Sequence, residues 1–219
     1  INKCGIDVSG KNVIVFGTGS DSLTVQAVIK DLGAKDIVTV SWQEIEESED
    51  FYNHDEVDII INTTANGMYP NNGMKFIELD RFPRLCGVME LIYNPRRTRL
   101  ICDAEDRDIP NSDGLSMLVA QAKRASEIFF DKEIDDSVTE KILKKVSTDM
   151  KSIVLIGMPG SGKSSIGTFL AEKTGREFLD TDEEAEKIAG SSPAEIIKAQ
   201  GEKSFRKIEN EAVKSICKL

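Results

Sequence analysis

A glycine-rich loop in the last third of the chain carries the residue types that bind polyphosphate. The apolar run Ile153 to Ile156 leads into Gly157-x-x-x-x-Gly162-Lys163-Ser164, and apolar residues at helical spacing follow. Glycines let backbone amides turn toward phosphate oxygens, and the N-terminus of the following helix adds partial positive charge. Strand, loop and helix in this order predict a P-loop that binds a nucleoside triphosphate.

The residue types in this loop suggest separate roles. Lys163 would bridge the β- and γ-phosphates, and the Ser164 hydroxyl would bind the Mg²⁺ that those phosphates share. A chance glycine-rich turn is the alternative, which the agreement of strand, loop and helix disfavours. We assign the following residues to the triphosphate site: Gly157, Gly160, Gly162, Lys163, Ser164 and Ser165.

A second glycine loop lies near the start of the chain. The strand Val13 to Phe16 runs into Gly17-Thr18-Gly19-Ser20, and a helix follows that Gly33 ends. This pattern is typical of a dinucleotide site, with Gly17, Gly19 and Ser20 as contacts. Many strand-to-helix turns need glycine for positive φ, so the loop alone leaves both readings open.

The order of the remaining elements predicts an α/β fold. Further strands are expected at Ile37 to Val40, Val57 to Ile61 and Gly87 to Tyr93. Strands separated by helical or long connections indicate a Rossmann-like, doubly wound parallel sheet. A long helix is expected over Leu115 to Phe130, with Leu118, Ala122 and Ala125 facing inward.

A capping box at Ser137-x-x-Glu140 is expected to begin a last short helix that ends near Val146. The polar residues 147–150 then separate two domains, 1–150 and 151–219. Residues 151–219 are expected to form an incomplete P-loop α/β unit.

Composition restricts the possible partners. The 219 residues are 40% hydrophobic with a net charge of −10, and residues 1–150 hold 27 acidic against 17 basic side chains. Such a surface repels nucleic acid and anionic membranes, no apolar run reaches the ~18 residues that span a bilayer, and Ile1 begins no secretory leader. We expect a cytoplasmic protein of small-molecule chemistry and leave its oligomeric state open.

Two features are interpreted as structural. The acidic stretch Glu44 to Asp58 is expected to be a solvated helix and loop, with His54 exposed rather than catalytic. The four cysteines are scattered and accompany a single histidine, so reduced thiols are expected rather than a zinc site or a disulfide framework.

Three motifs in the first domain resemble shikimate dehydrogenase, in the order of that family. They are INTTANGMYP at 61–70, LIYNPRRTRL at 91–100 and DGLSMLVAQA at 113–122. The resemblance implies an NADP-binding domain that serves the reduction of 3-dehydroshikimate to shikimate. Without the motifs, core packing would be the simpler explanation of Met68, Tyr93 and Met117.

The resemblance also implies site residues. Asn62, Thr63 and Met68 would line the cofactor channel, and Gly114 and Met117 would face the nicotinamide. Tyr93 and Gln121 would approach shikimate from the cofactor side. These assignments come from the motif positions alone.

The sequence departs from that family in two ways. The family's catalytic lysine and aspartate lie in an amino-terminal domain without a counterpart here, so these 219 residues are not expected to reduce dehydroshikimate unaided. Ser41-Trp42-Gln43 offers neither a base for a 2′-phosphate nor an acid for a ribose. Asp21 also lies where its carboxylate would compete with a pyrophosphate.

The second domain resembles shikimate kinase through FLDTD at 178–182 and GEKSFRKIE at 201–209. The resemblance implies that Asp180 helps to hold Mg²⁺, that Asp182 binds the shikimate ring hydroxyls and orients or deprotonates the attacking one, and that Arg206 clamps the shikimate carboxylate. Glu209 could hold that guanidinium in place.

The kinase part is expected to be truncated within the amphipathic helix Ser204 to Cys217, without the strand that carries the family's glycine-rich substrate loop and without its lid arginine. It should be loose unless it packs on the first domain.

The resemblances together imply consecutive steps of the shikimate pathway toward chorismate and the aromatic amino acids, with NADP, ATP and Mg²⁺ as cofactors and 3-dehydroshikimate and shikimate as substrates. The alternative is a non-catalytic nucleotide-binding or regulatory fragment.

Overall fold

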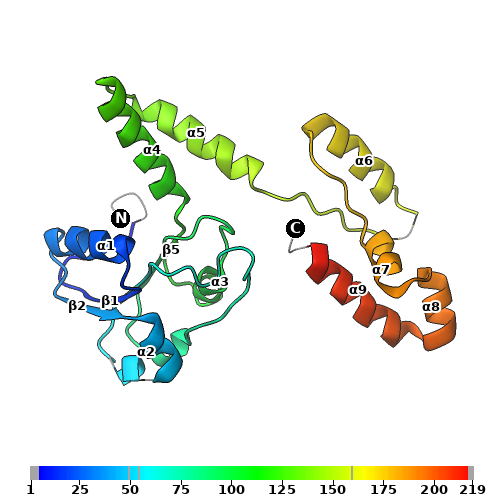
Figure 1. Cartoon of the computed structure of the whole chain (residues 1–219), viewed down its shortest axis with the longest axis horizontal. Helices are drawn as coiled ribbons and strands as arrows, with labels where there is room; N and C mark the ends of the chain where they lie inside the picture. Colours follow the sequence, from blue (N-terminus) through cyan, green and yellow to red (C-terminus); the bar gives the residue numbers. More distant parts are fainter. Residues whose placement is uncertain (1–4, 49, 54, 159, 217–219) are drawn as a thin grey trace. The chain divides into compact units, whose positions relative to one another are not determined.

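The computed structural model describes residues 5–48, 50–53, 55–158 and 160–216. The chain divides into two compact units, residues 1–150 and residues 151–219. The first is built around a sheet and the second from helices (Figure 1). Each unit is described by itself.

A five-stranded parallel sheet forms the centre of the first unit. Its strand order is β2-β1-β3-β4-β5, and every adjacent pair is parallel. The sheet confirms the predicted doubly wound α/β fold. The strands are β1 (Asn12–Phe16), β2 (Asp36–Val40), β3 (Ile59–Asn62), β4 (Gly87–Glu90) and β5 (Asn111–Ser112).

Side chains alternate across the sheet and supply two cores. Val13 and Val15 of β1 belong to a cluster with Ile29, whereas Ile14 and Phe16 belong to a cluster with Leu100. Both faces are therefore covered, as parallel sheets require. This explains why the runs Val13 to Phe16 and Ile59 to Ile61 are apolar at every position.

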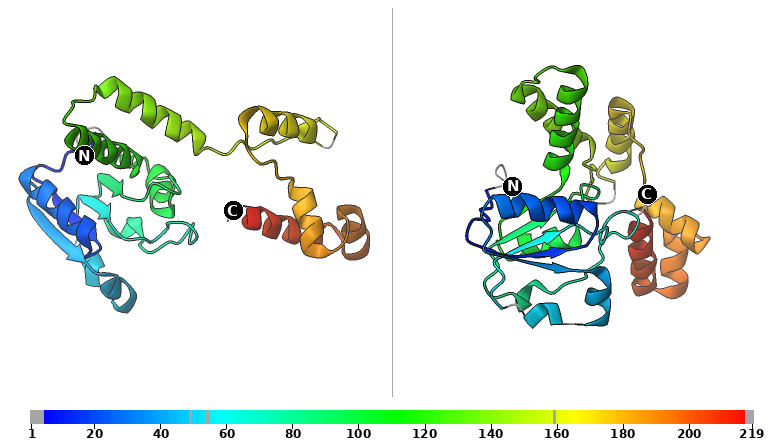
Figure 2. Two further views of the ribbon diagram at one scale, coloured as in Figure 1. Left: turned by 45° about the horizontal axis from the view of Figure 1, so that its top comes forward. Right: turned by 60° about the vertical axis from the view of Figure 1, so that its left-hand side comes forward.

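Helices and loops from different parts of the chain cover the two faces. Figure 2 shows α1 (Ser20–Asp31) on one side of the sheet and α2 (Trp42–Glu47) on the other. The face opposite α1 is covered by residues of α2, by the loop before β4 and by three short helices. These are η1 (Asp50–Asn53), η2 (Leu79–Arg81) and α3 (Arg99–Glu105).

The strand order creates a switch point between β1 and β3. The connection after β1 leads to β2 on one side, and the connection after β3 leads to β4 on the other. Ligands of open α/β sheets bind at the carboxyl ends of the strands at such a point. The fold thus places the first glycine loop and the residues after β3 where a ligand would bind.

The two helices that follow β5 differ from the sequence prediction. α4 (Leu115–Phe130) has the predicted bounds, but only Leu115 and Val119 are buried; Leu118 is half-buried, and Ala122 and Ala125 are exposed. α5 (Asp136–Asp149) is capped by Asp135 rather than Ser137 and continues through the predicted seam. α4 packs on α5, and the two alanines lie on its exposed surface.

Among its described residues, the second unit contains four helices and no strand. The predicted strand at Ile153 to Ile156 is wrong, because 151–158 have no regular structure and Val154 and Ile156 are 76% and 93% exposed. A strand forms by pairing, and no described segment of this unit offers a partner. The helices are α6 (Lys163–Thr174), α7 (Thr181–Ala189), α8 (Pro193–Gln200) and α9 (Glu202–Ile216).

A small apolar cluster holds three of these helices together. Its buried members are Ala185 of α7, Ile196 of α8, and Phe205 and Ala212 of α9. α6 meets the rest of the unit through Phe178, whose ring fills the space beside Gly167. The cluster is far smaller than the two cores of the first unit.

Some expectations lie outside the described residues. The exposure of His54 and the environments of Cys4 and Cys217 fall there. Cys86 is exposed and Cys102 half-buried, both as free thiols. Among the helices that the structure describes, none is both long and apolar enough to cross a bilayer.

Phe16 tests the sheet core. Its fully buried ring meets Phe51 and Phe76 edge to face. We expect Phe16→Ala to lower the free energy of unfolding of the first unit by about 3–5 kcal/mol, because a large cavity is left. Denaturant titration followed by Trp42 fluorescence measures this. Phe129→Ala is the matched control, since Phe129 is 82% exposed; similar losses in the two variants would contradict the described core.

Candidate nucleotide-binding sites

Gly17 lies in close contact with the residues that follow β3. Its φ is +113°, and a Cβ added there would lie 2.4 Å from the Thr63 hydroxyl oxygen. Thr63 in turn donates hydrogen bonds from its amide and its hydroxyl to the carbonyl of Phe16, at 2.9 and 2.7 Å. Glycine at 17 is therefore required by the fold itself, because it lets the ends of β1 and β3 meet.

Gly19 is not required by the fold in the same way. Its φ is −76°, which any residue adopts, and an added Cβ would meet no atom within 4 Å. It precedes Ser20 at the first turn of α1, where no side chain caps the helix. The backbone amides of this turn are open to a ligand, which suits a phosphate group.

Acidic side chains surround this loop. Asp21 lies in the first turn of α1 and is exposed. At the end of β2, Ser41 and Glu44 form a capping box, in which the Ser41 amide donates to the Glu44 carboxylate at 2.7 Å. The hydrogen bonds from the Ser41 hydroxyl and amide lower the pKa of Glu44. The end of β2 therefore presents an ionised carboxylate.

Asn62, at the end of β3, binds a buried carboxylate. Its Nδ2 lies 3.0 Å from each carboxylate oxygen of Glu90, which ends the neighbouring strand β4. Asn62 is fully buried and Glu90 is 2% exposed. The contact joins the predicted cofactor-binding motif to the motif that carries Tyr93.

Burial raises the pKa of Glu90 to about 7, although hydrogen bonds from Asn62, the Ile92 amide and Thr98 act in the opposite direction. The sequence analysis did not select Glu90. A signal was present, since a lone carboxylate ends an otherwise apolar strand, and buried acids are rare unless they are paired.

Gly114 packs directly on the chain after β4. An added Cβ would lie 1.9 Å from the carbonyl oxygen of Leu91, and the Gly114 amide donates to the carbonyl of Ile92 at 3.0 Å. α4 begins at this contact, which places Met117 on its first turn, half-buried.

The other predicted contacts of this domain are accessible. Tyr93 and Met68 are 42% and 44% exposed, and Gln121 is also exposed. Core packing therefore does not explain Met68 or Tyr93. The loops that carry them meet where the Tyr69 amide donates to the carbonyl of Asn94 at 3.4 Å.

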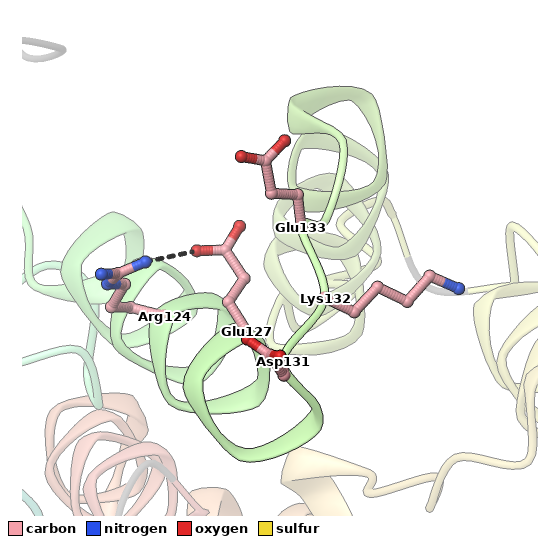
Figure 3. A pocket seen from close by; sticks show the side chains of 5 residues that line it. All are labelled: Arg124, Glu127, Asp131, Lys132 and Glu133. Carbon is pink, nitrogen blue, oxygen red and sulfur yellow. Dashed lines mark hydrogen bonds and ion pairs between the residues drawn. The ribbon is translucent and has the colours of Figure 1, made fainter.

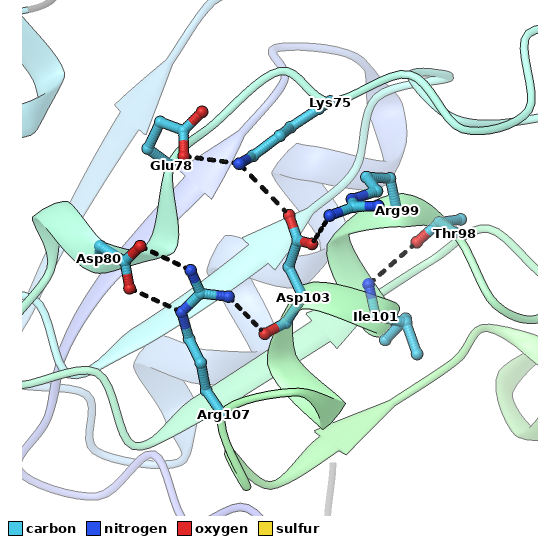
Figure 4. A network of polar contacts seen from close by, with 8 residues as sticks. All are labelled: Lys75, Glu78, Asp80, Thr98, Arg99, Ile101, Asp103 and Arg107. Carbon is cyan, nitrogen blue, oxygen red and sulfur yellow. Dashed lines mark hydrogen bonds and ion pairs between the residues drawn. The ribbon is translucent and has the colours of Figure 1, made fainter.

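Two ion-pair groups hold the loop between β4 and α3. Arg96 binds Asp113 at 2.7 Å and also contacts Ser147 of α5. On α3, Asp103 accepts from Arg99 at 2.7 Å, and Arg107 forms two hydrogen bonds with Asp80 (Figure 4). The Arg99–Asp103 pair lies within α3, whereas Arg107, just after α3, joins this segment to Asp80 in the loop before β4.

In the second unit, two glycines before α6 have left-handed backbone conformations. Gly160 and Gly162 have φ of +76° and +83°, and α6 begins at Lys163. The Lys163 ammonium donates to the carbonyls of Gly157 and Met158, at 2.8 and 2.9 Å. The Lys163 side chain therefore folds back onto the loop that precedes it. Ser164 and Ser165 lie in the first turn of α6 and are exposed.

The two predicted metal ligands lie together. The Ser164 hydroxyl donates to a carboxylate oxygen of Asp180 at 3.2 Å. Hydroxyl and carboxylate oxygens are suitable ligands for Mg²⁺. Within the part of the chain that the structure describes, no cluster of three or more His, Cys, Asp or Glu forms a metal site, so any Mg²⁺ here would need phosphate oxygens and water as further ligands.

Asp182 and Arg206 lie on helices that pack against each other. Asp182 is exposed in the first turn of α7, and its amide donates to Asp180 at 2.9 Å. Arg206 of α9 donates to Glu209 at 2.8 Å and to Glu202 at 3.2 Å. Glu209 thus holds the guanidinium, as its spacing suggested, and both contacts raise the pKa of Arg206.

A further hollow lies at the turn between α4 and α5. It is lined by Arg124, Glu127, Asp131, Lys132 and Glu133 (Figure 3). The lining is mostly charged, and Glu127 already accepts from Arg124 and from the Ile134 amide. None of the predicted site residues lines it.

The two units define classes of protein. A parallel sheet with a glycine turn at its switch point is a doubly wound nucleotide-binding domain, and the loop before α6 is a P-loop followed by its helix. Comparison with known proteins indicates which families each unit resembles.

The first unit is similar to shikimate dehydrogenases. The NADP(+) shikimate dehydrogenase of Clostridium perfringens strain SM101 is 28% identical over 160 residues, which are 67% of this chain and 59% of that protein. A chorismate mutase/shikimate 5-dehydrogenase fusion protein from Clostridium acetobutylicum has a similar structure. Its TM-score is 0.60 at 29% identity, and the match covers 69% of this chain and 59% of that one.

The second unit is similar to shikimate kinases. Residues 159–219 match the shikimate kinase family model. The shikimate kinase of Thermodesulfovibrio yellowstonii is 49% identical over 67 residues, which are 31% of this chain and 39% of that protein. The chain therefore joins a dehydrogenase-like part to a kinase-like part. The matches span about 59% of the Clostridium perfringens dehydrogenase and about 39% of the Thermodesulfovibrio yellowstonii kinase.

Gly114 provides a test of the contact between α4 and β4. We expect Gly114→Ala to lower the free energy of unfolding of the first unit by about 1–3 kcal/mol or more, because the new methyl group would overlap the Leu91 carbonyl. Denaturant titration measures the loss. Gly19→Ala, with open space at its Cβ, is the control and should change stability little; a Gly114→Ala variant as stable as this control would contradict the described packing.

Glu90 makes stability depend on pH. Its pKa is raised from 4.5 to about 7, so between these values the folded chain holds a proton that the unfolded chain has lost. Stability from this group is therefore fully present below about pH 4.5 and falls as pH rises to about 7, by on the order of 3 kcal/mol.

The matched variant is Glu90→Gln, which cannot titrate. The difference in melting temperature between the variant and the parent chain should grow in the variant's favour from pH 5 to pH 8. A difference that stays constant over this range would show that Glu90 does not titrate there.

Proposed function

We propose that residues 1–150 form the NADP-binding half of a shikimate dehydrogenase and that residues 151–219 form the ATP-binding opening part of a shikimate kinase. The observation that carries the proposal is the meeting of the dehydrogenase motifs at one edge of the sheet. Thr63 lies against Gly17, Asn62 binds the end of β4, and Gly114 packs on the chain that leads to Tyr93.

In the dehydrogenase-like half, the open first turn of α1 would receive the pyrophosphate, with Gly17, Gly19 and Ser20 beside it. Asn62, Thr63 and Met68 would line the channel to the nicotinamide, which Gly114 and Met117 would face. Bound NADPH would supply the hydride. The exposed side chains of Tyr93 and Gln121 would position the shikimate ring.

In the kinase-like half, Lys163 would exchange the loop carbonyls that it now contacts for phosphate oxygens, together with the amides of Gly157, Gly160, Gly162 and Ser165. Ser164 and Asp180 would hold Mg²⁺, which would screen the charge on the phosphates.

The acceptor in the kinase-like half would be a shikimate hydroxyl. Asp182 would orient or deprotonate it, and Arg206, held by Glu209, would bind the shikimate carboxylate as a bidentate partner. Attack on the γ-phosphoryl group would then give shikimate 3-phosphate.

Both reactions would be consecutive, since the first forms the substrate of the second. The role that we propose for these 219 residues is to bind nucleotides and to position substrates. Catalytic turnover is proposed for a whole protein that contains both parts. The cytoplasmic location expected from the sequence stays a prediction.

A non-catalytic nucleotide-binding role is the second candidate. It is favoured by the acidic surroundings of the dinucleotide loop, because Asp21 and the ionised Glu44 would repel the phosphates of NADP. Under this reading, the P-loop would bind ATP while the first unit would bind no NADP.

Paired titrations test the proposal. We expect NADPH, followed by Trp42 fluorescence, and ATP with Mg²⁺, followed by calorimetry, each to bind the chain saturably. Gly19→Asp should weaken NADPH binding at least tenfold, because a carboxylate enters the space meant for phosphate. Lys163→Ala should weaken ATP binding at least tenfold, because the ammonium is lost.

Each variant serves as the control for the other ligand. Gly19→Asp should bind ATP normally, and Lys163→Ala should bind NADPH normally; Lys173→Ala, at the far end of α6, should affect neither. Saturable ATP binding without any NADPH binding would favour the second candidate, and the absence of both would reject the two candidates together.

A further inference from the structure

Glu90 joins three segments of the proposed dinucleotide edge. Its carboxylate accepts two hydrogen bonds from Asn62, one from the Ile92 amide at 3.1 Å and one from the Thr98 hydroxyl at 3.1 Å. Asn62 begins the loop after β3, Ile92 precedes Tyr93, and Thr98 is the N-cap of α3. One buried side chain thus sets where three loops lie relative to one another.

All the donors to this carboxylate are neutral. The loop at 62–68 contains no charged residue. The nearby arginines bind other acids. Between β4 and α3, Arg96 pairs with Asp113 and Arg97 with Glu105. Arg99, the first residue of α3, pairs with Asp103 (Figure 4). Among the described residues, no cation forms an ion pair with Glu90, so its charge is balanced by dipoles alone.

A directed chain of hydrogen bonds leads from the surface to Glu90. The amide and side-chain nitrogens of Asn66 donate to the Thr64 hydroxyl, and that hydroxyl donates to the side-chain oxygen of Asn62 at 2.7 Å. Asn62 then donates to Glu90. These donors point toward the carboxylate, and Asn62 also donates a longer hydrogen bond back to the Asn66 carbonyl at 3.5 Å. Hydrogen bonds in such a chain strengthen one another.

The same chain holds the loop that would face a dinucleotide. Gly67 lies between Asn66 and Met68, and a Cβ added there would lie 3.5 Å from the Cβ of Thr98. Its φ of +92° disfavours any other residue at this position. The position of Met68 therefore depends on contacts that end at Glu90.

We propose that Glu90 is the positioning residue of the dinucleotide edge and that its carboxylate takes up a proton from solvent when a dinucleotide binds above it. The inference rests on the proposed dehydrogenase half. A dinucleotide brings phosphate charge and excludes water from the loops, and both effects disfavour a buried carboxylate that lacks a cation. The added proton lies on Glu90, and Asn62 continues to donate to the other carboxylate oxygen.

Calorimetry of NADPH binding to the 219-residue chain tests this proposal. Buffers with different ionisation enthalpies report the number of protons taken up. With a pKa of about 7 in the free chain, we expect uptake of about half a proton near pH 7.5, and NADPH affinity that rises about three- to tenfold from pH 8.5 to pH 6.5.

Glu90→Gln is the decisive variant. It retains the size of the side chain and one oxygen that can accept from Asn62 and Ile92, and its NH2 group replaces the oxygen that accepts from Thr98. It cannot take up a proton in this pH range. It should bind NADPH without the Glu90 share of proton uptake and with a flatter pH profile. Because the 2′-phosphate of the ligand titrates equally with both proteins, the difference between the proteins belongs to Glu90.

Thr64→Val tests the positioning chain without altering Glu90. It removes the hydroxyl between Asn66 and Asn62, and we expect about tenfold weaker NADPH binding with proton uptake retained. Thr139→Val in α5 is the matched control, since the Thr139 hydroxyl has no hydrogen-bond partner in the described structure; its NADPH affinity should be unchanged.

The outcomes distinguish failure of the proposed dehydrogenase half from failure of the proposed role of Glu90. If the parent chain binds no NADPH, the proposed dehydrogenase half fails and this inference fails with it. If the parent chain and Glu90→Gln bind NADPH with equal proton uptake at every pH, only the inference is overturned. Normal binding by Thr64→Val would overturn the positioning role.

Discussion

The parallel pairing of β1 with β3 is the constraint on which the first unit depends. It brings the ends of two strands so close together that only hydrogen fits at the α-carbon of Gly17 beside Thr63. Pairing of β4 with β5 produces a similar close approach, where Gly114 after β5 fits against Leu91 after β4. The loops that carry the dehydrogenase-like motifs are thereby gathered at one edge, and sheet register rather than loop sequence sets their distances.

A buried carboxylate at this edge is costly for the fold. Replacing Glu90 by an apolar residue would remove the desolvation penalty but would leave the side chains of Asn62 and Thr98 without their acceptor. The raised pKa of Glu90 reflects this desolvation penalty on the charged carboxylate. Strain of this kind is common where a site must hold several loops in one arrangement.

Sequence reasoning succeeded where local pattern and long-range packing agree. Strands β1 to β4, helix α4 and the start of α6 follow from apolar runs, glycine turns and helical periodicity, and the motifs located the edge of the sheet. It failed at Ile153 to Ile156, because β-branched residues form a strand only with a partner. It missed Glu90, because the role of that residue arises from neighbours 28 and 8 positions away, which only the sheet brings together.

The uncovered run at 153–156 has a consequence of its own. This segment has four consecutive aliphatic side chains, and its backbone amides and carbonyls are not paired in a β-sheet. Such a segment can pair with a strand from another molecule. Neighbouring Lys151 supplies the nearest charge that discourages such contact. Concentrated solutions of this polypeptide would therefore tend to self-associate through cross-β contacts at this segment, whereas a companion strand from its own fold would shield it.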